Sequence, residues 1–363
     1  MLDNSVYLPQ AVNTSHPESS RSNDSKYDII KFFLSLMVLA IHSVLYPMIL
    51  YPWLRIAVPI FFMISSKFIF SKLYNVSEAT QATILKKFII RNLRLYLCWF
   101  VILLPIIVYT RKDQYFSADF FTNALTILKS ILFGSTFVAS WFIMATITGV
   151  LVIYFLIKLL RKDFFVFLFS FFAFCIVTLA SSYSCVISDT FISSAINSYT
   201  KIFDGLICSF PAALFWIFIG KLFAEHNMPI KSLSLWALLV LFSSIALFIE
   251  WKFVISLDGS HNNDSYFMLA PLCFLLFLGI ENIQPIYWKN SFYFKRASTI
   301  IYVVHGSLLS IVSKAISMFF NVRIPALSFI LTLIGCIVIY VLLEITLKKC
   351  RNAHVCKILK MLF

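Results

Sequence analysis

The segment YDIIKFFLSLMVLAIHS, residues 27–43, is an apolar run that carries Asp28 and Lys31 at its start and His42 near its end. With the apolar residues that follow, it is long enough to span a membrane, since about 20 helical residues cross about 30 Å of hydrocarbon. An ionisable imidazole is costly there unless it faces protein or a water-filled cavity. The segment therefore predicts a membrane helix that contains a polar site.

The composition of the whole chain predicts a polytopic membrane protein. Of 363 residues, 61% are hydrophobic, only 13% are charged, and 40 are phenylalanine. A soluble domain of this length needs more polar side chains to cover its surface. Apolar runs of about 18 residues recur along the chain, whereas the ~10-residue alternating segments of a membrane barrel are absent. We predict an all-α transmembrane helical bundle.

The apolar runs predict ten spans between a polar first segment and a basic tail. Residues 1–27 are rich in Ser and Asn and are predicted to be a disordered cytoplasmic segment without a removable signal peptide. Residues 28–347 form the predicted transmembrane domain, and residues 348–363 form a basic cytoplasmic tail. The predicted spans are 29–50, 53–73, 93–110, 139–160, 164–183, 205–224, 232–250, 264–282, 298–319 and 325–347.

Basic residues gather in alternate loops, and this pattern predicts the orientation of the chain. Both termini are predicted to be cytoplasmic by the positive-inside rule, so the net charge of +14 reflects topology and needs no nucleic-acid partner. The basic clusters are Lys86, Lys87, Arg91 and Arg94; Lys158, Arg161 and Lys162; Lys289, Lys295 and Arg296; and the tail from Lys348 to Lys360.

Cysteines and the longest outward loop give weaker signals. The eight cysteines show no CxxC spacing, and only Cys185 falls in a predicted outward loop, so we expect neither a disulfide framework nor a metal cofactor. The outward loop 111–138 contains FFTNALTILKSILFGS, which predicts an interfacial or re-entrant helix. This helix either lies on the bilayer surface or serves as a functional lid.

Polar side chains line one face of the first predicted span. Lys31 and His42 are eleven residues apart, about three turns plus 20°, so they share a face and are separated by roughly 16 Å along the axis. Asp28, Ser35 and Tyr46 lie within roughly 60° of the same line. One interpretation is structural, with an imidazole bonded to a neighbouring helix and an interfacial ion pair of Asp28 with Lys31. The other is a track by which a charged ligand enters from the cytoplasm.

Five motifs follow one another along the chain. They are YDIIKFFLSLMVLAIH, with ten positions between a basic residue and histidine; RIAVPIFFMISS, with Arg55, Pro59, Phe61, Phe62 and Ser65; RNLR, with Arg91 and Arg94; SWFIM at 140–144; and IYVVH at 301–305. Together they resemble the membrane-bound acyltransferase 3 family over about residues 27–347. The departures from its pattern are Lys31 where many members have Arg, Ser66 for a usual Gly, Gly306 for a common Pro, and no His before Trp141.

The resemblance implies transfer of an acetyl group from acetyl-CoA to a sugar hydroxyl, by residues 28–347 as an acyltransferase domain. Coenzyme A carries a pyrophosphate and a 3′-phosphate, which require clustered positive charge, and we expect Arg91, Arg94 and Lys31 to bind it. His42, assisted by Lys31, is the predicted general base, because a neutral imidazole accepts a proton near pH 7. His305 is expected to line the same cavity and to orient donor or acceptor, or else to serve in packing.

Two residues near the predicted outer surface are candidates for the acceptor. An unpaired arginine is costly at the start of a span, so Arg55 is predicted to bind a glycan or lipid phosphate. Trp141 is predicted either to stack on a sugar or to belong to the aromatic belt. Glu250 and Glu344, near the ends of spans, are interpreted as interfacial anchors.

We therefore predict an integral-membrane O-acetyltransferase, with acyl-CoA and a cell-surface glycan or its lipid-linked precursor as partners, in a bacterial inner membrane. Direct transfer to the hydroxyl is preferred over an acyl-histidine intermediate. The alternative is a glycan exporter of the same architecture, with the polar stripe as its path. No paired, glycine-broken spans support that alternative.

Overall fold

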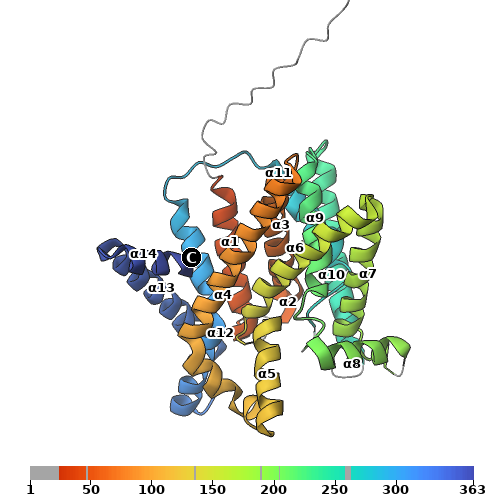
Figure 1. The fold of residues 1–363 in the computed structure, drawn as a ribbon. Helices are drawn as coiled ribbons and strands as arrows, with labels where there is room; N and C mark the ends of the chain where they lie inside the picture. Colours follow the sequence, from red (N-terminus) through yellow and green to blue (C-terminus); the bar gives the residue numbers. More distant parts are fainter. Residues whose placement is uncertain (1–23, 46–47, 135, 189, 204, 258–262) are drawn as a thin grey trace, which may run out of the picture.

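A computed structural model describes residues 24–363, except 46–47, 135, 189, 204 and 258–262 (Figure 1). The described residues form a helical bundle without strands. The helices are α1 (Lys26–Ser43), α2 (Tyr51–Leu54), α3 (Ala57–Leu73), α4 (Glu78–Tyr115), α5 (Phe120–Phe133), α6 (Ser140–Leu160), α7 (Asp163–Ser182), α8 (Phe191–Phe203), α9 (Pro211–Glu225), α10 (Leu233–Ser256), α11 (Leu269–Asn282), α12 (Ser291–Phe320), α13 (Pro325–Lys349) and α14 (Ala353–Leu359), with 3-10 turns η1 (Met48–Leu50) and η2 (Lys360–Leu362).

Each predicted span overlaps a helix, which confirms an all-α polytopic bundle. Among the described residues, seven helical segments are long and apolar enough to cross a membrane: α2 with α3, α4, α6, α7, α10, α12 and α13. Two others are short, since α9 has 15 residues and α11 has 14. The 18 residues of α1 include three charged side chains, Lys26, Asp28 and Lys31. The count of ten spans stays a prediction.

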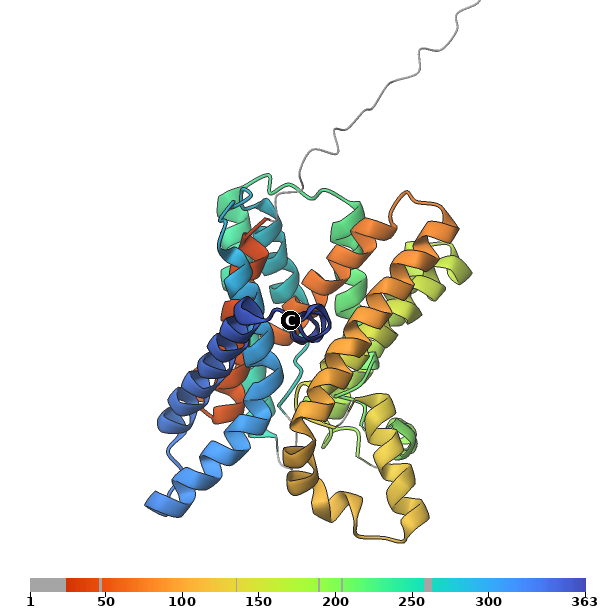
Figure 2. The ribbon, with the colours of Figure 1, turned by 60° about the vertical axis from the view of Figure 1, so that its left-hand side comes forward.

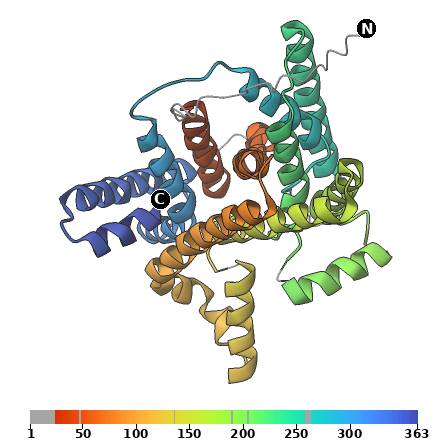
Figure 3. The ribbon, with the colours of Figure 1, turned by 45° about the horizontal axis from the view of Figure 1, so that its top comes forward.

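Helix α3 lies at the centre of the bundle and packs closely on α9 (Figure 3). Gly220 of α9 makes this approach possible, because a Cβ there would lie 1.9 Å from Ser66 Oγ and 2.4 Å from the Met63 carbonyl oxygen. Small residues allow membrane helices to approach in this way. The position that departs from the family's Gly, Ser66, is thus accommodated by a glycine on the opposing helix.

Helix α12 packs along α1 and α13 on one side of the bundle, while α4 lies opposite (Figure 2). We call the end at which α1 begins the inner end, because the charge pattern predicts that it is cytoplasmic. A buried ammonium ties α7 to α9 there: Lys221 Nζ lies 2.6 Å from carboxylate oxygens of both Asp163 and Glu225. These two carboxylates and His226 converge closely enough to hold a metal, but the ammonium already lies between the carboxylates.

Residues 24–27 are ordered, which corrects the prediction that disorder extends to residue 27. The Ser25 amide donates to the Ile286 carbonyl at 2.7 Å, and Asp24 Oδ1 accepts from the Ile286 amide at 3.1 Å. The side chain of Tyr27 is buried. The polar residues that suggested disorder instead form hydrogen bonds between the start of α1 and the loop before α12. Residues 1–23 lie outside the described residues.

Two amphipathic helices lie at the outer end (Figure 1). The predicted helix in loop 111–138 is α5, capped by Asp119, and bonds from Thr122 and backbone amides lower the pKa of this carboxyl. Helix α8 was not predicted. Lys129 Nζ of α5 donates to the Lys201 carbonyl of α8 at 3.0 Å, and Phe133 contacts Phe203 with ring centroids 5.0 Å apart.

Candidate functional site

The packing of α1 on α12 places two histidines at one cavity. The ring centroids of His42 and His305 are 5.1 Å apart, with 36° between the ring planes. Both rings line a cavity of about 170 Å³, here called the outer cavity, whose other walls come from α3, α6, α7, α9 and the loop before α11. Gly306 allows the loop before α6 to approach this point, since a Cβ would lie 2.5 Å from Val138.

His305 presents a hydrogen-bond acceptor to this cavity. Its Nδ1 lies 3.0 Å from the Ile301 carbonyl oxygen and 2.7 Å from that of Tyr302. Carbonyl oxygens only accept, so Nδ1 carries the proton in the neutral ring and Nε2 holds the lone pair. The ring is 1% exposed, and Nε2 has no partner among the described residues. A buried, unpaired acceptor costs about 1–3 kcal/mol, which a ligand in the cavity would offset.

His42 lines the cavity with its ring accessible, in contrast to the buried ring of His305. Within the described part of the chain its nitrogens form no hydrogen bond, so the structural interpretation of a ring bonded to a neighbouring helix gains no support. Of the other stripe residues, Ser35 donates to the Phe32 carbonyl of its own helix at 2.7 Å. Tyr46 lies outside the described residues.

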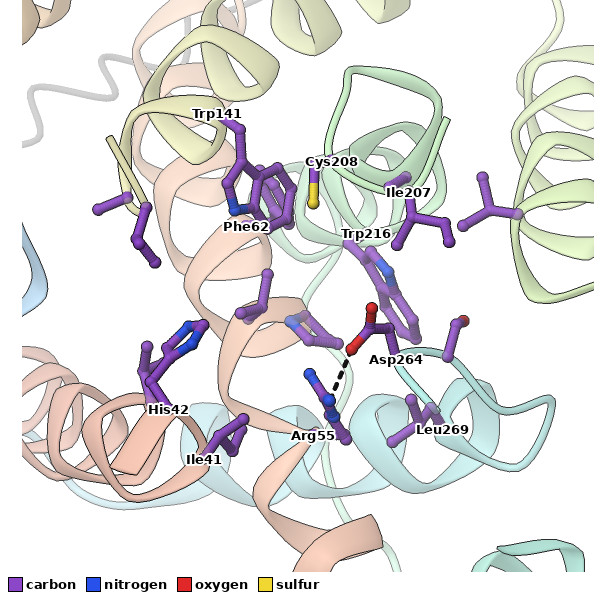
Figure 4. Close-up of a pocket in the computed structure, with 18 of the residues that line it drawn as sticks. Ile41, His42, Arg55, Phe62, Trp141, Ile207, Cys208, Trp216, Asp264 and Leu269 are labelled. Carbon is purple, nitrogen blue, oxygen red and sulfur yellow. Dashed lines mark ion pairs between the residues drawn. The ribbon is translucent and has the colours of Figure 1, made fainter. Parts of the chain in front are cut away.

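Arg55 and Trp141 both line the outer cavity, but Arg55 is not unpaired as the sequence interpretation assumed. Arg55 Nη2 lies 2.6 Å from Asp264 Oδ1 (Figure 4). The guanidinium also stacks 4.5 Å from the Tyr51 ring centroid. Asp264 removes the cost of the isolated charge, so that cost no longer argues for a bound phosphate. Trp141 packs edge-on against Phe62, with ring centroids 6.0 Å apart.

The inner end holds a second, larger cavity rich in positive charge, which we call the basic cavity. It has two adjoining lobes: a central lobe of about 490 Å³, next to α3 and α6, and a tail lobe of about 500 Å³, next to η2. The lobes share Lys31, Arg91, Asn92, Leu95, Lys295, Ser298 and Thr299, and the tail lobe adds Lys87 and Arg94. The predicted donor-binding residues Lys31, Arg91 and Arg94 are thus brought together.

The cations of the tail lobe are not matched by carboxylates among the described residues. In the described residues no acidic side chain lines the tail lobe, and no ion pair involves its lysines or arginines. Asp28 lines the central lobe but pairs with a hydroxyl rather than with Lys31, since Ser291 Oγ donates to Asp28 Oδ2 at 3.1 Å. The described residues therefore show no close ion pair between Asp28 and Lys31, and the like charges gathered in this cavity favour a polyanionic ligand.

Three aromatic rings separate the two cavities, and we call them the aromatic partition. The Tyr302 centroid lies 5.3 Å from that of Phe61 and 5.2 Å from that of Phe142, and the two phenylalanines are 6.0 Å apart. Phe61 and Phe142 line the central lobe, while Tyr302 lines both that lobe and the outer cavity. The two cavities therefore meet at Tyr302.

The structure brings the predicted inner cations together and adds residues that the sequence did not single out. His305 lines the outer cavity with His42, as expected, and does not line the basic cavity, so it is separate from the predicted phosphate-binding cations. Asp264 and Lys295 were not singled out, because Asp264 follows no motif and Lys295 resembled one more inner-loop cation. Tyr302 stood inside IYVVH without an assigned role. Its position one turn before His305 was the available signal.

Comparison with protein families now identifies the chain. The model of the family described as "Acyltransferase domain" matches residues 24–341. The chain belongs to this family, the acyltransferase 3 family, and is an integral, multi-pass membrane acyltransferase. Comparison with curated proteins and with solved structures gives no match.

Proposed function

We propose that this protein transfers an acetyl group from cytoplasmic acetyl-CoA to a hydroxyl of a cell-surface glycan or of its lipid-linked precursor, in a bacterial inner membrane. The observation that carries the proposal is the meeting of two different cavities at Tyr302, one basic and open to polyanions, the other holding two histidines. Acetyl-CoA has a polyanionic nucleotide, which fits the basic cavity, and a thin arm that ends in the thioester, which fits the cavity with the histidines.

The basic cavity supplies what the nucleotide of CoA requires. Its phosphates carry several negative charges, and arginine binds phosphate through two parallel N–H donors. Arg91 and Arg94 are one turn apart on α4, and Lys31 and Lys295 approach from α1 and α12. Because no ion pair in the described part of the chain involves Arg91 or Arg94, they are available to a ligand.

The pantetheine arm then reaches past the aromatic partition toward His42. Lys31 and His42 are about 16 Å apart along α1, a span that a flexible, narrow arm covers. The rings of Phe61, Phe142 and Tyr302 are apolar, so they suit the uncharged arm and exclude the nucleotide. The thioester is thereby delivered to the outer cavity while the phosphates remain with the cations.

In the outer cavity His42 acts as general base. It takes the proton of the acceptor hydroxyl while the alcohol oxygen attacks the thioester carbonyl. The C–S bond breaks, the acetyl group stays on the oxygen, and the departing thiolate receives the proton back from the imidazolium. The fixed lone pair on His305 Nε2 accepts a hydrogen bond from the His42 imidazolium and stabilises its charge, with His305 as a positioning residue.

The acceptor is proposed to approach from the outer end. Trp141 offers an aromatic face to a sugar, and the Arg55–Asp264 pair offers donors and acceptors to its hydroxyl groups (Figure 4). Ser265, which lines the same cavity, adds a hydroxyl. In this arrangement donor and acceptor come from opposite faces and meet at the histidine pair.

Two measurements on purified protein in nanodiscs test the proposal. Titration with CoA is expected to show saturable binding. Incubation with radiolabelled acetyl-CoA and the lipid-linked glycan fraction of the source cells is expected to label the glycan. A glycan exporter has no reason to bind CoA, so absence of CoA binding would favour that alternative. Binding without any transfer to a glycan would instead redirect the search to another acceptor.

A further inference from the structure

The residues that follow α13 turn back to the basic cavity. After Lys349 the chain reverses, and Asn352 caps α14 by accepting from the His354 amide at 2.9 Å and the Val355 amide at 3.4 Å. Helix α14 then leads into η2, which contacts α4. Figure 2 shows this segment, in dark blue, between α12 and α13 on one side and α4 on the other.

Specific contacts hold η2 against the bundle. Leu362 is only 4% exposed, and its carbonyl accepts a hydrogen bond from Trp99 Nε1 of α4 at 3.1 Å. The Phe363 ring centroid lies 5.0 Å from the guanidinium of Arg296, which is itself paired with Glu344 at 2.6 Å. Glu344 is therefore a buried partner of this guanidinium rather than the interfacial anchor that the sequence suggested.

The same segment forms a wall of the tail lobe. Lys360, Met361 and Phe363 line it, facing the cations of α1, α4 and α12. Lys360 thus adds a sixth positive charge to a lobe that already holds Lys31, Lys87, Arg91, Arg94 and Lys295. A tail that merely anchored the chain to the membrane would gain nothing by placing a lysine among like charges. A multiply charged phosphate ligand explains the placement.

We propose that residues 350–363 are part of the donor site. Lys360 binds the nucleotide phosphates of CoA, and Trp99 is a positioning residue that holds η2 through Leu362. The proposal rests on the proposed function, since it takes CoA as the ligand of the basic cavity. The segment lies beyond the matched residues 24–341, so its role is a feature of this chain outside the family domain.

The test compares three variants of the full-length protein in nanodiscs. Lys360→Gln removes the charge, Trp99→Phe removes the hydrogen bond to Leu362, and Lys357→Gln removes a charge of α14 that does not line the cavity. Binding of CoA and of 3′,5′-ADP is measured by titration calorimetry. The Lys360→Gln variant is expected to weaken both about tenfold, the typical weight of one charge-assisted hydrogen bond. Lys357→Gln is expected to match the wild type.

Trp99→Phe is expected to raise the KM for acetyl-CoA several-fold at unchanged kcat, because a looser η2 affects binding but not the acyl group. Equal CoA affinity in Lys360→Gln and wild type would overturn the tail proposal alone. Absence of CoA binding in the wild type would overturn the proposed function and the tail's role with it. If CoA does not bind and the basic cavity instead retains anionic phospholipid, measured by mass spectrometry of co-purified lipid, the ligand is a lipid headgroup.

Discussion

The outer cavity and the basic cavity lie on either side of Tyr302 and differ in size, charge and lining. The outer one is about 170 Å³ and carries two histidines, two tryptophans and one ion pair. The basic one consists of two lobes of about 490 and 500 Å³ and carries a cluster of lysine and arginine without matching carboxylates in its tail lobe. The outer cavity therefore suits acyl transfer, and the basic cavity suits tight binding of a polyanion.

This contrast implies that binding and chemistry are encoded in different residues of the same helices. Helix α1 contributes Lys31 to one cavity and His42 to the other, and α12 contributes Lys295 and His305 in the same way. A change at one end should therefore alter donor affinity, and a change at the other should alter turnover.

The largest effect is expected from His42→Ala. Loss of a general base should lower kcat about 10²- to 10⁴-fold while the Kd for CoA stays within about twofold of the wild type. Acetyl transfer is measured at saturating donor, and CoA titration serves as the control for folding. Wild-type turnover in a well-expressed variant would remove His42 from the mechanism.

The opposite pattern is expected from Arg91→Gln combined with Arg94→Gln. Two charge-assisted contacts to phosphate are lost, so the KM for acetyl-CoA should rise on the order of 10²-fold with little change in kcat. Lys86→Gln is the matched control, since Lys86 lies on the same helix but lines neither cavity. A fall in kcat at unchanged KM would break the division between the two cavities.

His305→Phe separates two roles for this residue. Without the Nε2 acceptor the His42 imidazolium is less stable, and kcat should fall roughly 10- to 100-fold at unchanged donor KM. The kcat and the KM for acetyl-CoA are measured for this variant and for the wild type. A rise in donor KM at normal kcat would show instead that His305 orients the donor.

Tyr302→Ala tests the aromatic partition. Removal of the ring opens space beside the thioester, so kcat/KM for butyryl-CoA relative to acetyl-CoA should increase about tenfold, within the range that small differences in acyl size produce. Tyr302→Phe keeps the ring and should leave the ratio unchanged. An unchanged ratio in the alanine variant would show that Tyr302 does not limit acyl length.

The smallest effect is expected from Asp264→Asn. The Arg55 and Asp264 side chains are 18% and 34% exposed, so solvent partly screens the pair, and its coupling should be about 1 kcal/mol, lowering Tm in detergent by a few degrees. In a double-mutant cycle with Arg55→Gln the two losses should not add. Additive losses would show that Arg55 and Asp264 act independently, and Arg55 would again be a candidate for binding a phosphate of the acceptor.

Sequence periodicity predicted the helices and their local faces well. A polar stripe on an apolar helix has one solution in a membrane, so Lys31 and His42 were correctly expected to face the protein interior or a cavity. Arg91 and Arg94 were expected to be together because they are one turn apart. Such predictions succeed because they need only the geometry of one helix.

Pairings between distant segments could not be predicted in the same way. Asp264 meets Arg55 across a loop, and Glu250, interpreted as an anchor, accepts from the amides of Phe267 at 2.7 Å and Met268 at 2.8 Å just before α11. Nothing in the local sequence states which helices will adjoin. The fold of the tail onto Trp99 depends on the same long-range packing.

The most direct test of the central claim is a structure of the protein with CoA bound, determined by cryo-electron microscopy in nanodiscs. The account predicts the nucleotide phosphates among Lys31, Arg91 and Arg94, with the pantetheine arm passing Tyr302 and the sulfur beside His42. Nucleotide density outside the basic cavity, or an arm directed away from the histidines, would contradict it.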